Sequence, residues 1–371
     1  MIQKLRKKIV KRLRRLRRLL QTMALCHRLV PCWHWRYLQA VRRGYRLCCR
    51  GGFTPAEAFR LGLFGPEVSP GRSDQFVSKK SWCRLQAILN PSEWIHLTRD
   101  KGIFYRFCLA NGIPVPELFA LFFREGAGWS ACGLRLQHRA DWQELLEEKL
   151  PEAFIIKPAT GSYSQDVNVF SRSGDGFLDF HGRFYRASDI IDWMAGNTRY
   201  DCFVLQARLD NHPELVRLSA TKALQTARII SFIDRDGNCR ILHAHFKPIT
   251  GPHLTDTFLE GFTGNVEAPV SLANGRLQSA NRIAGTGEGV MEVPVHPLTG
   301  LPLAGFQLPL WQEACSLVLA TAPKFLPLRA IGWDVALTPQ GPVILEGNSW
   351  WDPPNQHGCI PMLAHQLDNF R

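Results

Sequence analysis

The chain has 371 residues, of which 45% are hydrophobic and 21% are charged. These values exclude wholesale disorder and leave room for one large domain or two to three smaller ones. The formal net charge of +13 is concentrated at one end: residues 1–50 carry sixteen Lys or Arg and no Asp or Glu, whereas the remaining residues carry 29 basic and 32 acidic side chains. We therefore expect no specific nucleic-acid-binding surface on the body of the protein.

The first fifty residues are predicted to form a basic amphipathic helical segment. Within residues 1–20, aliphatic side chains recur every three or four positions, on one side of a helix; these are Ile2, Leu5, Ile9, Leu13, Leu16 and Leu20. Ten Lys or Arg lie between them, which is typical of helices that bind an anionic membrane surface without spanning it. We expect residues 1–20 to hold the protein peripherally on the inner face of a membrane. A solvated tail, a mitochondrial-type presequence and a non-specific nucleic-acid contact are the alternatives.

The spacing of the cysteines and the hydropathy of the chain indicate the cellular compartment of the protein. The eleven cysteines form no Cys-x-x-Cys pair, so the sequence predicts neither a disulfide framework nor a zinc site, and reduced thiols indicate a cytoplasmic protein. His243 and His245, on one face of a predicted strand, are interpreted as structural. No apolar run reaches the roughly 18–20 residues that span a bilayer, and the N-terminus lacks the apolar core of a secretory signal.

The body begins with a region at residues 51–97 that is predicted to be helical, with Pro/Gly turns at Gly65 and Pro66 and at Pro70 and Gly71. A helix is then predicted from an N-cap at Thr98 to residues 111–112, and a later one at 189–195 with Ser188 as its cap. The remaining predicted elements are helices at 141–149 and 311–322 and strands at 117–123, 153–157, 167–170, 202–206, 225–233, 239–246, 330–337 and 343–346.

The connections between the later strands indicate the fold class. The strands at 225–233 and 239–246 flank the turn Asp234-Arg-Asp-Gly237, which predicts an antiparallel hairpin. Those at 330–337 and 343–346 flank Thr338-Pro-Gln-Gly341 in the same way. Because these strands form hairpins rather than crossovers, the predicted class is α+β and not a doubly wound parallel sheet.

The second hairpin carries three oxygen-bearing side chains. Asp334 lies in its first strand, and Glu346 and Asn348 lie at the end of its second. Residues two apart on a strand face the same way, so Glu346 and Asn348 should converge, with Asp334 beside them. Two carboxylates and an amide oxygen suit Mg²⁺, and burying both carboxylates among apolar strands would be costly without a cation. The alternative is an ordinary hairpin whose acids face water.

Two further elements offer cations for anionic ligands. Lys157 ends a predicted buried strand and precedes a loop of small residues, Gly161-Ser-Tyr-Ser164, whose backbone N–H groups could bind phosphate. Arg228 and Lys247 lie on neighbouring strands of the first hairpin and could hold a γ-phosphate or a carboxylate. Each of these signals is weak alone, because surface residues give the same patterns.

In this order, the elements resemble the ATP-grasp ligases over residues 100–348, roughly two thirds of the chain. Asp100-Lys101 followed by Gly112-Ile-Pro-Val-Pro116 is similar to the family's first lysine helix, and Ile155-Ile-Lys157-Pro is similar to its second lysine. Phe203-Val-Leu-Gln206 is similar to its hinge strand. The most specific likeness is that of Asp334, Glu346 and Asn348 to the metal triad of the family.

The resemblance implies an ATP-grasp fold, in which two α+β subdomains sandwich ATP, here at residues 98–200 and 201–371. It also implies roles for single residues: Lys101, Lys157, Gly161 and Ser162 at the phosphates, Leu205 and Gln206 at the adenine, Asp334, Glu346 and Asn348 as Mg²⁺ ligands, and Arg228 and Lys247 as catalytic cations.

Within that superfamily the chain most resembles the sugar-transfer-associated ATP-grasp proteins, through Gln225-Thr-Ala-Arg228, Asp256 with Gly261, and Gly332-Trp-Asp334. This resemblance implies a ligase that joins a small-molecule or sugar-linked carboxylate to an amine through an acyl phosphate, in surface-polysaccharide or sugar-conjugate biosynthesis. A kinase of a small molecule or sugar on the same fold is one alternative. A catalytically silent, membrane-recruited scaffold is the other.

Overall fold

The computed structural model of the chain describes residues 2–29, 35–65, 75–161, 164–285 and 287–363, and for residues 2–5, 7, 8 and 260 the backbone alone. Its α-helices are α1 (Ile2–Leu29), α2 (Trp35–Arg46), α3 (Pro55–Arg60), α4 (Lys79–Leu89), α5 (His96–Arg99), α6 (Lys101–Ala110), α7 (Arg139–Glu144), α8 (Ala187–Gly196), α9 (Pro213–Ser219) and α10 (Trp311–Thr321). Short 3₁₀ and π segments are η1 (Leu47–Gly51), η3 (Leu145–Lys149), η4 (Leu259–Gly261), η5 (Ala322–Phe325) and η6 (Asn355–His357).

The strands form three sheets. They are β1 (Leu118–Phe123), β2 (Trp129–Ser130), β3 (Ala153–Pro158), β4 (Asn168–Ser173), β5 (Gly176–Asp179), β6 (Phe184–Tyr185), β7 (Cys202–Ala207), β8 (Thr226–Ile233), β9 (Cys239–Phe246), β10 (Ala268–Pro269), β11 (Ala280–Ala284), β12 (Gly289–Val293), β13 (Ala330–Thr338) and β14 (Gly341–Asn348). Every pair of these strands is antiparallel. The predicted α+β class is confirmed.

The first sheet has the strand order β2-β1-β7-β3-β4-β5-β6. Its core, which includes Trp142 of α7 and Ile190 of α8, packs around Phe154 and Phe203 on the central strands. β7 pairs with both β1 and β3. The chain leaves the first sheet only after β7, which joins β1 to β3 and lies beyond the predicted subdomain boundary between residues 200 and 201.

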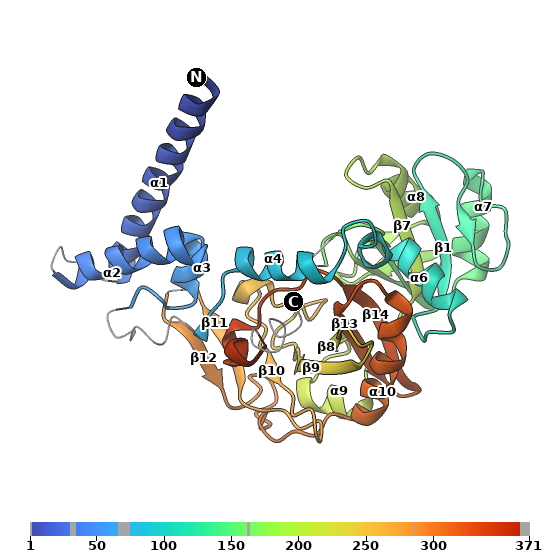
Figure 1. Ribbon diagram of the computed structural model, residues 1–371. Helices are drawn as coiled ribbons and strands as arrows, with labels where there is room; N and C mark the ends of the chain where they lie inside the picture. Colours follow the sequence, from blue (N-terminus) through green and yellow to red (C-terminus); the bar gives the residue numbers. More distant parts are fainter. Residues whose placement is uncertain (1, 30–34, 66–74, 162–163, 286, 364–371) are drawn as a thin grey trace.

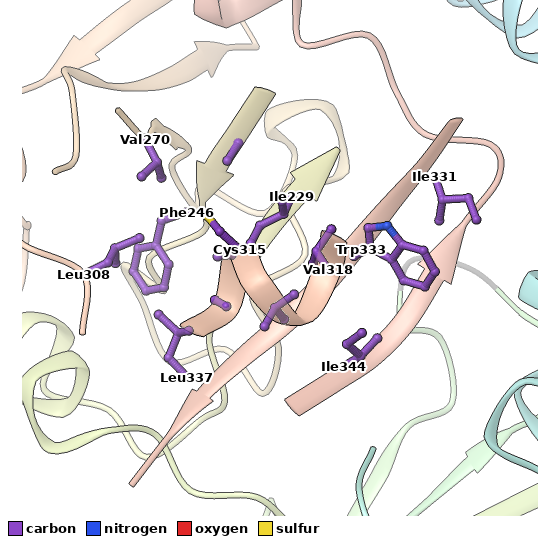
Figure 2. Packing of buried hydrophobic residues seen from close by; sticks show 14 of the residues in the cluster. Ile229, Phe246, Val270, Leu308, Cys315, Val318, Ile331, Trp333, Leu337 and Ile344 are labelled. Atoms are coloured by element: carbon purple, nitrogen blue, oxygen red, sulfur yellow. The ribbon is translucent and has the colours of Figure 1, made fainter. Parts of the chain in front are cut away.

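The second sheet has the order β10-β9-β8-β13-β14. One face of it packs against α10, and Figure 2 shows Ile229, Val318 and Trp333 meeting there. Successive residues of a strand point to opposite faces, so Arg228 and Asp334, which alternate with these core residues, point to the other face. The period of two along β8 and β13 thus separates the hydrophobic core from the polar face of the sheet.

Both predicted hairpins are confirmed. β8 pairs with β9, and β13 pairs with β14 so that Asp334 lies opposite Glu346 and Gly332 lies opposite Asn348. The predicted helix at 311–322 corresponds to α10. Between β9 and α10, by contrast, the sequence predicts no elements, and the structure has the short strands β10, β11 and β12 there.

The start of the first lysine helix differs from the prediction. Thr98 is not its cap, because the chain forms the short α5 first and α6 begins only at Lys101. Asp100 caps α6 instead: its Oδ1 accepts a hydrogen bond from the N–H of Ile103 at 3.0 Å. The Thr98 hydroxyl is engaged elsewhere, with Ser349 Oγ at 2.9 Å.

The residue predicted to cap the helix at 189–195 also differs from the one that caps it in the structure. Ser188 lies within the first turn of α8, which begins at Ala187, so the predicted cap is wrong; the N–H of Arg186 instead bonds Asp189 Oδ2 at 2.8 Å. The turn at Pro70 and Gly71 falls outside the described residues.

The N-terminal helix α1 projects away from the rest of the molecule, with the N terminus at its far end (Figure 1). It extends beyond residues 1–20, which carry the predicted apolar stripe, and packs against α2 and α3 near its C-terminal end. Ile9, Leu13, Leu16 and Leu20 of the predicted apolar stripe are exposed, and the side chains of Ile2 and Leu5 lie outside the described residues. None of the helices in the described ranges combines the length and apolarity needed to cross a bilayer.

The last described segment, residues 349–363, returns to α4, and both pack on the second sheet. Asn90, directly after α4, donates to the carbonyls of Ala330 and Ser349 at 2.8 and 2.9 Å. The N–H of Val77 donates to Asn355 Oδ1 at 2.9 Å. The helical region before residue 98 therefore belongs structurally to the second subdomain.

Candidate active site

A cavity of about 990 Å³ lies between the two large sheets. The first subdomain contributes Lys101, Lys157 and Gln206 to its wall, and the second contributes Arg228 and Asp334. Ten Lys or Arg and seven Asp or Glu line it. This excess of cations favours an anionic ligand.

Asp334 is the centre of a buried charge cluster on the cavity side of the second sheet. Arg228, its register partner on β8, donates from Nε to Oδ1 at 2.5 Å and from Nη2 to Oδ2 at 2.9 Å. Lys247 Nζ donates to Asp334 Oδ1 at 3.2 Å and lies 3.5 Å from Asp256 Oδ1. The structure thus brings the predicted pair of cations together, and it joins them through Asp334.

The cluster keeps its cations charged. Burial raises the pKa of Asp334, but Arg228 and then Lys247 outweigh it and hold that pKa well below its usual range. Burial lowers the pKa of Arg228, and Asp334 raises it by more. The pKa of Lys247 is raised in the same way, since Asp256 and Asp334 outweigh its burial. At neutral pH, Arg228 and Lys247 can therefore meet an anionic ligand as cations.

Glu346 and Asn348 stand together at the end of β14 and line the cavity. Asn348 Nδ2 donates to Glu346 Oε1 at 3.3 Å, and Glu346 Oε2 lies 3.5 Å from Lys101 Nζ. Adjacent carboxylate and amide oxygens on a partly exposed wall fit the ligand preference of Mg²⁺. Asp334, the third predicted ligand, already accepts three hydrogen bonds from its two cations. Glu346 and Asn348 are therefore better placed than Asp334 to hold a metal ion.

Lys157 is buried at the end of β3, where its Nζ donates to Tyr105 Oη at 2.8 Å. Tyr105 in turn donates to the carbonyl of Leu345 at 2.7 Å. Burial, followed by the proximity of Lys101, lowers the pKa of Lys157 to about 7. Tyr105 was not predicted as a site residue. Its signal was its place one turn after Lys101 on the same helix face.

The loop after β3 is tied to the start of α6. The N–H of Lys101 donates to the carbonyl of Ala159 at 2.8 Å, and its Nζ donates to that of Gly161 at 3.4 Å. Gly161 lines the cavity, as predicted for a residue of the phosphate loop. Ser162, predicted beside it, falls outside the described residues.

The two predicted hinge residues point in opposite directions. Leu205 is fully buried in the core of the first sheet and does not line the cavity, whereas Gln206 does. The Oε1 of Gln206 is buried and has no hydrogen-bond partner among the described residues, so it can accept a hydrogen bond from a ligand. The cavity wall continues through Arg208 and Leu209. Of the two residues predicted at the adenine, Gln206 thus lies on the cavity wall and the side chain of Leu205 does not.

Two further acids of the cavity wall were not predicted as site residues. Asp256 Oδ2 accepts from the N–H and the hydroxyl of Thr226 at 2.8 and 2.5 Å, which fixes it beside Lys247. The sequence indicated Asp256 only through the family resemblance. Glu267, which precedes the two-residue β10, gave no signal at all.

Comparison with solved structures gives likenesses of low identity. The chain is similar to D-alanine–D-alanine ligase from Bacillus anthracis at 11% identity, with 74% of this chain and 67% of that chain covered and a TM-score of 0.40. It is similar to L-amino acid ligase from Bacillus licheniformis at 13% identity, with 69% of this chain and 43% of that chain covered and a TM-score of 0.38. It is also similar to the biotin carboxylase domain of Hydrogenobacter thermophilus 2-oxoglutarate carboxylase, in complex with MgADP, at 11% identity. Here 80% of this chain and 47% of that chain are covered, and the TM-score is 0.40. The chain thus spans about half the length of the last two.

No curated protein matches the chain significantly. The profile of a family described as sugar-transfer associated ATP-grasp, however, matches residues 82–363, from α4 to the end of the described chain. The match contains both lysines, the Asp334 cluster and the Glu346–Asn348 pair. The chain therefore belongs to the sugar-transfer associated ATP-grasp family.

Proposed function

We propose that the protein is an ATP-dependent, Mg²⁺-requiring ligase that joins the carboxylate of a small molecule or sugar to an amine. The observation that carries the proposal is the convergence of Lys101, Lys157, Arg228 and the oxygen donors Glu346 and Asn348 on one cavity. Membership of an ATP-grasp family supports ATP as the source of the free energy.

ATP fits the first-subdomain side of the cavity. The unpartnered Oε1 of Gln206 can accept a hydrogen bond from the exocyclic amine of adenine. Lys101 and Lys157 would hold the α- and β-phosphates, as the resemblance implies. Mg²⁺ held by Glu346 and Asn348, with Asp334 behind them, would neutralise charge on the phosphates.

The second subdomain supplies the cations for transfer of the γ-phosphoryl group. A carboxylate oxygen of the substrate bonds to the γ-phosphorus while the bond to the β–γ bridging oxygen breaks, which gives an acyl phosphate and ADP. Arg228, assisted by Lys247, stabilises the charge on the transferring group. The amine nitrogen then bonds to the acyl carbon, phosphate leaves with its oxygen, and the amine loses a proton.

The rest of the cavity has room and charge for the acid. Its volume stands at the upper end of the range of ligand pockets, about 300–1,000 Å³. Further cations line it away from the Asp334 cluster: Arg60, Lys79, Arg99, Arg199, Arg208 and Lys222. These side chains favour an anionic second substrate, for which uronic acids and amino acids are the first candidates in a pathway of surface-polysaccharide or sugar-conjugate biosynthesis.

We expect ADP release to require both an acid and an amine. The measurement is ADP formation in a panel of uronic acids and amino acids, with hydroxylamine as a general amine that traps an acyl phosphate as a hydroxamate. ADP formed from a sugar without any amine would establish the kinase alternative. No ADP with any acceptor would favour the silent scaffold.

A matched pair of variants ties turnover to the predicted metal ligands. Glu346→Gln should lower kcat by at least about 100-fold, because it weakens the Mg²⁺ site that stabilises transition-state charge. Glu148→Gln, in an exposed side chain on η3, should leave kcat unchanged. Equal activity of both variants would contradict the assignment of Glu346.

We further propose that α1 holds the protein at the cytoplasmic, inner face of an anionic membrane. The described part of its aliphatic stripe is solvent-exposed, with Leu13 59% and Leu20 56% exposed. In its C-terminal half, Arg18 Nη1 donates to the carbonyl of Cys48 at 3.1 Å, so this half is fastened to the segment that follows α2. An exposed apolar stripe flanked by cations would insert at the headgroup level.

Removing four cations from α1 should weaken binding to vesicles of phosphatidylcholine and phosphatidylserine by roughly 1,000-fold, since each contributes about 1 kcal/mol near an anionic surface. The variant replaces Arg6, Lys11, Arg12 and Arg14 with glutamine. A control of equal net charge replaces the exposed Arg135, Arg183, Arg235 and Arg282. Co-sedimentation measures binding. Equal loss in both variants, or equal binding to pure phosphatidylcholine, would contradict the proposal.

A further inference from the structure

Three histidines and a cysteine meet at one end of the polar face of the second sheet. His243 and His245 lie two residues apart on β9, while His357 ends η6 and Cys359 follows it. The centroids of the three imidazole rings lie 4.8–5.6 Å from one another. The side chain of His357 is fully buried, and His243 and His245 are buried as well.

The ring nitrogens of two of these histidines face each other. His243 Nε2 lies 2.9 Å from His357 Nδ1. One ligand atom each from His243, His357 and Cys359 falls within a group whose members are no more than 4.8 Å apart. A tetrahedral zinc site with Zn–N of about 2.0–2.1 Å needs its nitrogens roughly 3.3 Å apart. The two ring nitrogens would therefore have to separate by only a few tenths of an ångström, while Cys359 Sγ, which lies within 4.8 Å of them, would have to move closer.

The second nitrogen of His357 supports the same interpretation independently. His357 Nε2 is buried and forms no hydrogen bond in the described chain, yet Glu267 Oε2 lies 3.4 Å from it. A metal-bound histidine usually directs its other ring nitrogen at a carboxylate, which fixes the tautomer and makes the ring a better ligand.

We propose that His243, His357 and Cys359 form a zinc site, with Glu267 as the carboxylate that orients His357. Two imidazoles and a thiolate are ligands that zinc prefers over Mg²⁺, which selects oxygen. A water molecule would be the fourth ligand. This site is separate from the oxygen donors Glu346 and Asn348 and does not depend on the proposed ligase activity.

A bound ion would connect two parts of the second subdomain. His243 belongs to the sheet, whereas His357 and Cys359 belong to the returning segment 349–363, so a bound ion would cross-link the two. That segment carries Trp351 and Asn355, which line the cavity. Zinc would thereby fix one wall of the cavity.

The test uses the full-length chain without a polyhistidine tag, because such a tag binds zinc itself. Protein from zinc-supplemented cells should retain one zinc per chain after gel filtration, measured by elemental analysis. After chelation, Co²⁺ should restore stoichiometric binding with the thiolate-to-cobalt charge-transfer band and the visible spectrum of a tetrahedral site. Cys359→Ser should abolish that band, and His357→Asn should lower zinc affinity at least 100-fold.

Two matched variants separate ligation from general damage. Cys239→Ser alters another half-buried cysteine, at the start of β9, and should leave zinc content and the cobalt band unchanged. Glu267→Gln should lower zinc affinity about 10- to 100-fold, the effect of losing an orienting carboxylate. The proposal is overturned if the wild type retains no zinc and shows no cobalt–thiolate band. Equal metal content and spectra in the wild type and Cys359→Ser would overturn it too, since His243 and His357 would then be a hydrogen-bonded pair within the core.

Discussion

Replacing Asp334 by asparagine should lower the free energy of unfolding by about 3–5 kcal/mol, the usual effect of removing one partner of a buried ion pair. The substitution preserves the size of the side chain. It removes, however, the charge that accepts two hydrogen bonds from Arg228 and one from Lys247. Both cations are then left buried with a neutral amide between them. Urea unfolding of the ligand-free protein measures the difference.

The surface of the molecule offers a matched control. Asp192 accepts hydrogen bonds from both terminal nitrogens of Arg139, but its side chain is 62% exposed. Such pairs contribute at most about 1 kcal/mol, so Asp192→Asn should have little effect. The double variant Arg228→Met with Asp334→Asn should recover part of the loss, because it removes an uncompensated cation. A loss for Asp334→Asn no larger than that for Asp192→Asn would mean that the cluster is not held by charge.

The effect of Asp334 should also fade in acid. The pKa of Asp334 is lower in the folded protein than in the unfolded chain. Its contribution is therefore fully present above about pH 4, the unfolded value, and is lost as the pH falls toward the folded value. The stability difference between wild type and variant should be smaller at pH 3 than at pH 7.

Replacing Lys157 by methionine should have the opposite effect on the ligand-free protein and raise its stability at pH 6 by roughly 3 kcal/mol. The pKa of Lys157 is about 7 in the folded state and about 10.4 in the unfolded chain, so at pH 6 burying the ammonium costs on the order of 4 kcal/mol. The lost hydrogen bond to Tyr105 offsets about 1 kcal/mol of the gain. Between pH 7 and 10.4 the unfolded chain binds more protons than the folded protein, so the free energy of unfolding of the wild type rises with pH. The difference in this free energy between Lys157→Met and the wild type therefore becomes smaller. Unfolding at pH 6 and pH 9 measures this.

The same variant should lose its response to ATP. Mg-ATP at 100 times its dissociation constant adds about 2.7 kcal/mol to the wild type, which raises Tm by a few degrees for a protein of this size. Lys157→Met removes a phosphate-binding cation and should show little of this rise. Lys149→Met, in an exposed side chain, should behave as the wild type in both measurements. A full Mg-ATP response in Lys157→Met would show that Lys157 does not hold phosphate.

Local patterns predicted the parts of the site that depend on one hairpin at a time. The turn at residues 338–341 and the alternation along its strands were enough to place Glu346 and Asn348 side by side. The pairing of Arg228 with Asp334, which lie 106 positions apart in the sequence, could not be predicted in this way, because it depends on the register between β8 and β13.

Other differences arise from competition between equally suitable residues. Thr98 and Asp100 are both good helix caps, and the contact of Thr98 with Ser349, 251 residues later, decides between them. Leu205 and Gln206 differ by one position, and only the packing of the first sheet's core reveals which of their side chains faces the cavity. The His243–His357 contact joins residues 114 positions apart, so no spacing motif could indicate it.

The hydrogen bonds of Asn90 to Ala330 and Ser349 have a consequence for synthesis on the ribosome. These partners lie 240 and 259 residues downstream. At about 5–20 residues per second, α4 therefore emerges roughly 10–50 s before the groups that bind it. During this interval the apolar face of α4, with Trp82 and Leu89, still lacks Ala330, Trp351 and Ile360 of its native cluster. The first sheet, complete by residue 207, can form in the meantime, so the nascent chain is expected to close from its middle outward and to join its two flanks last.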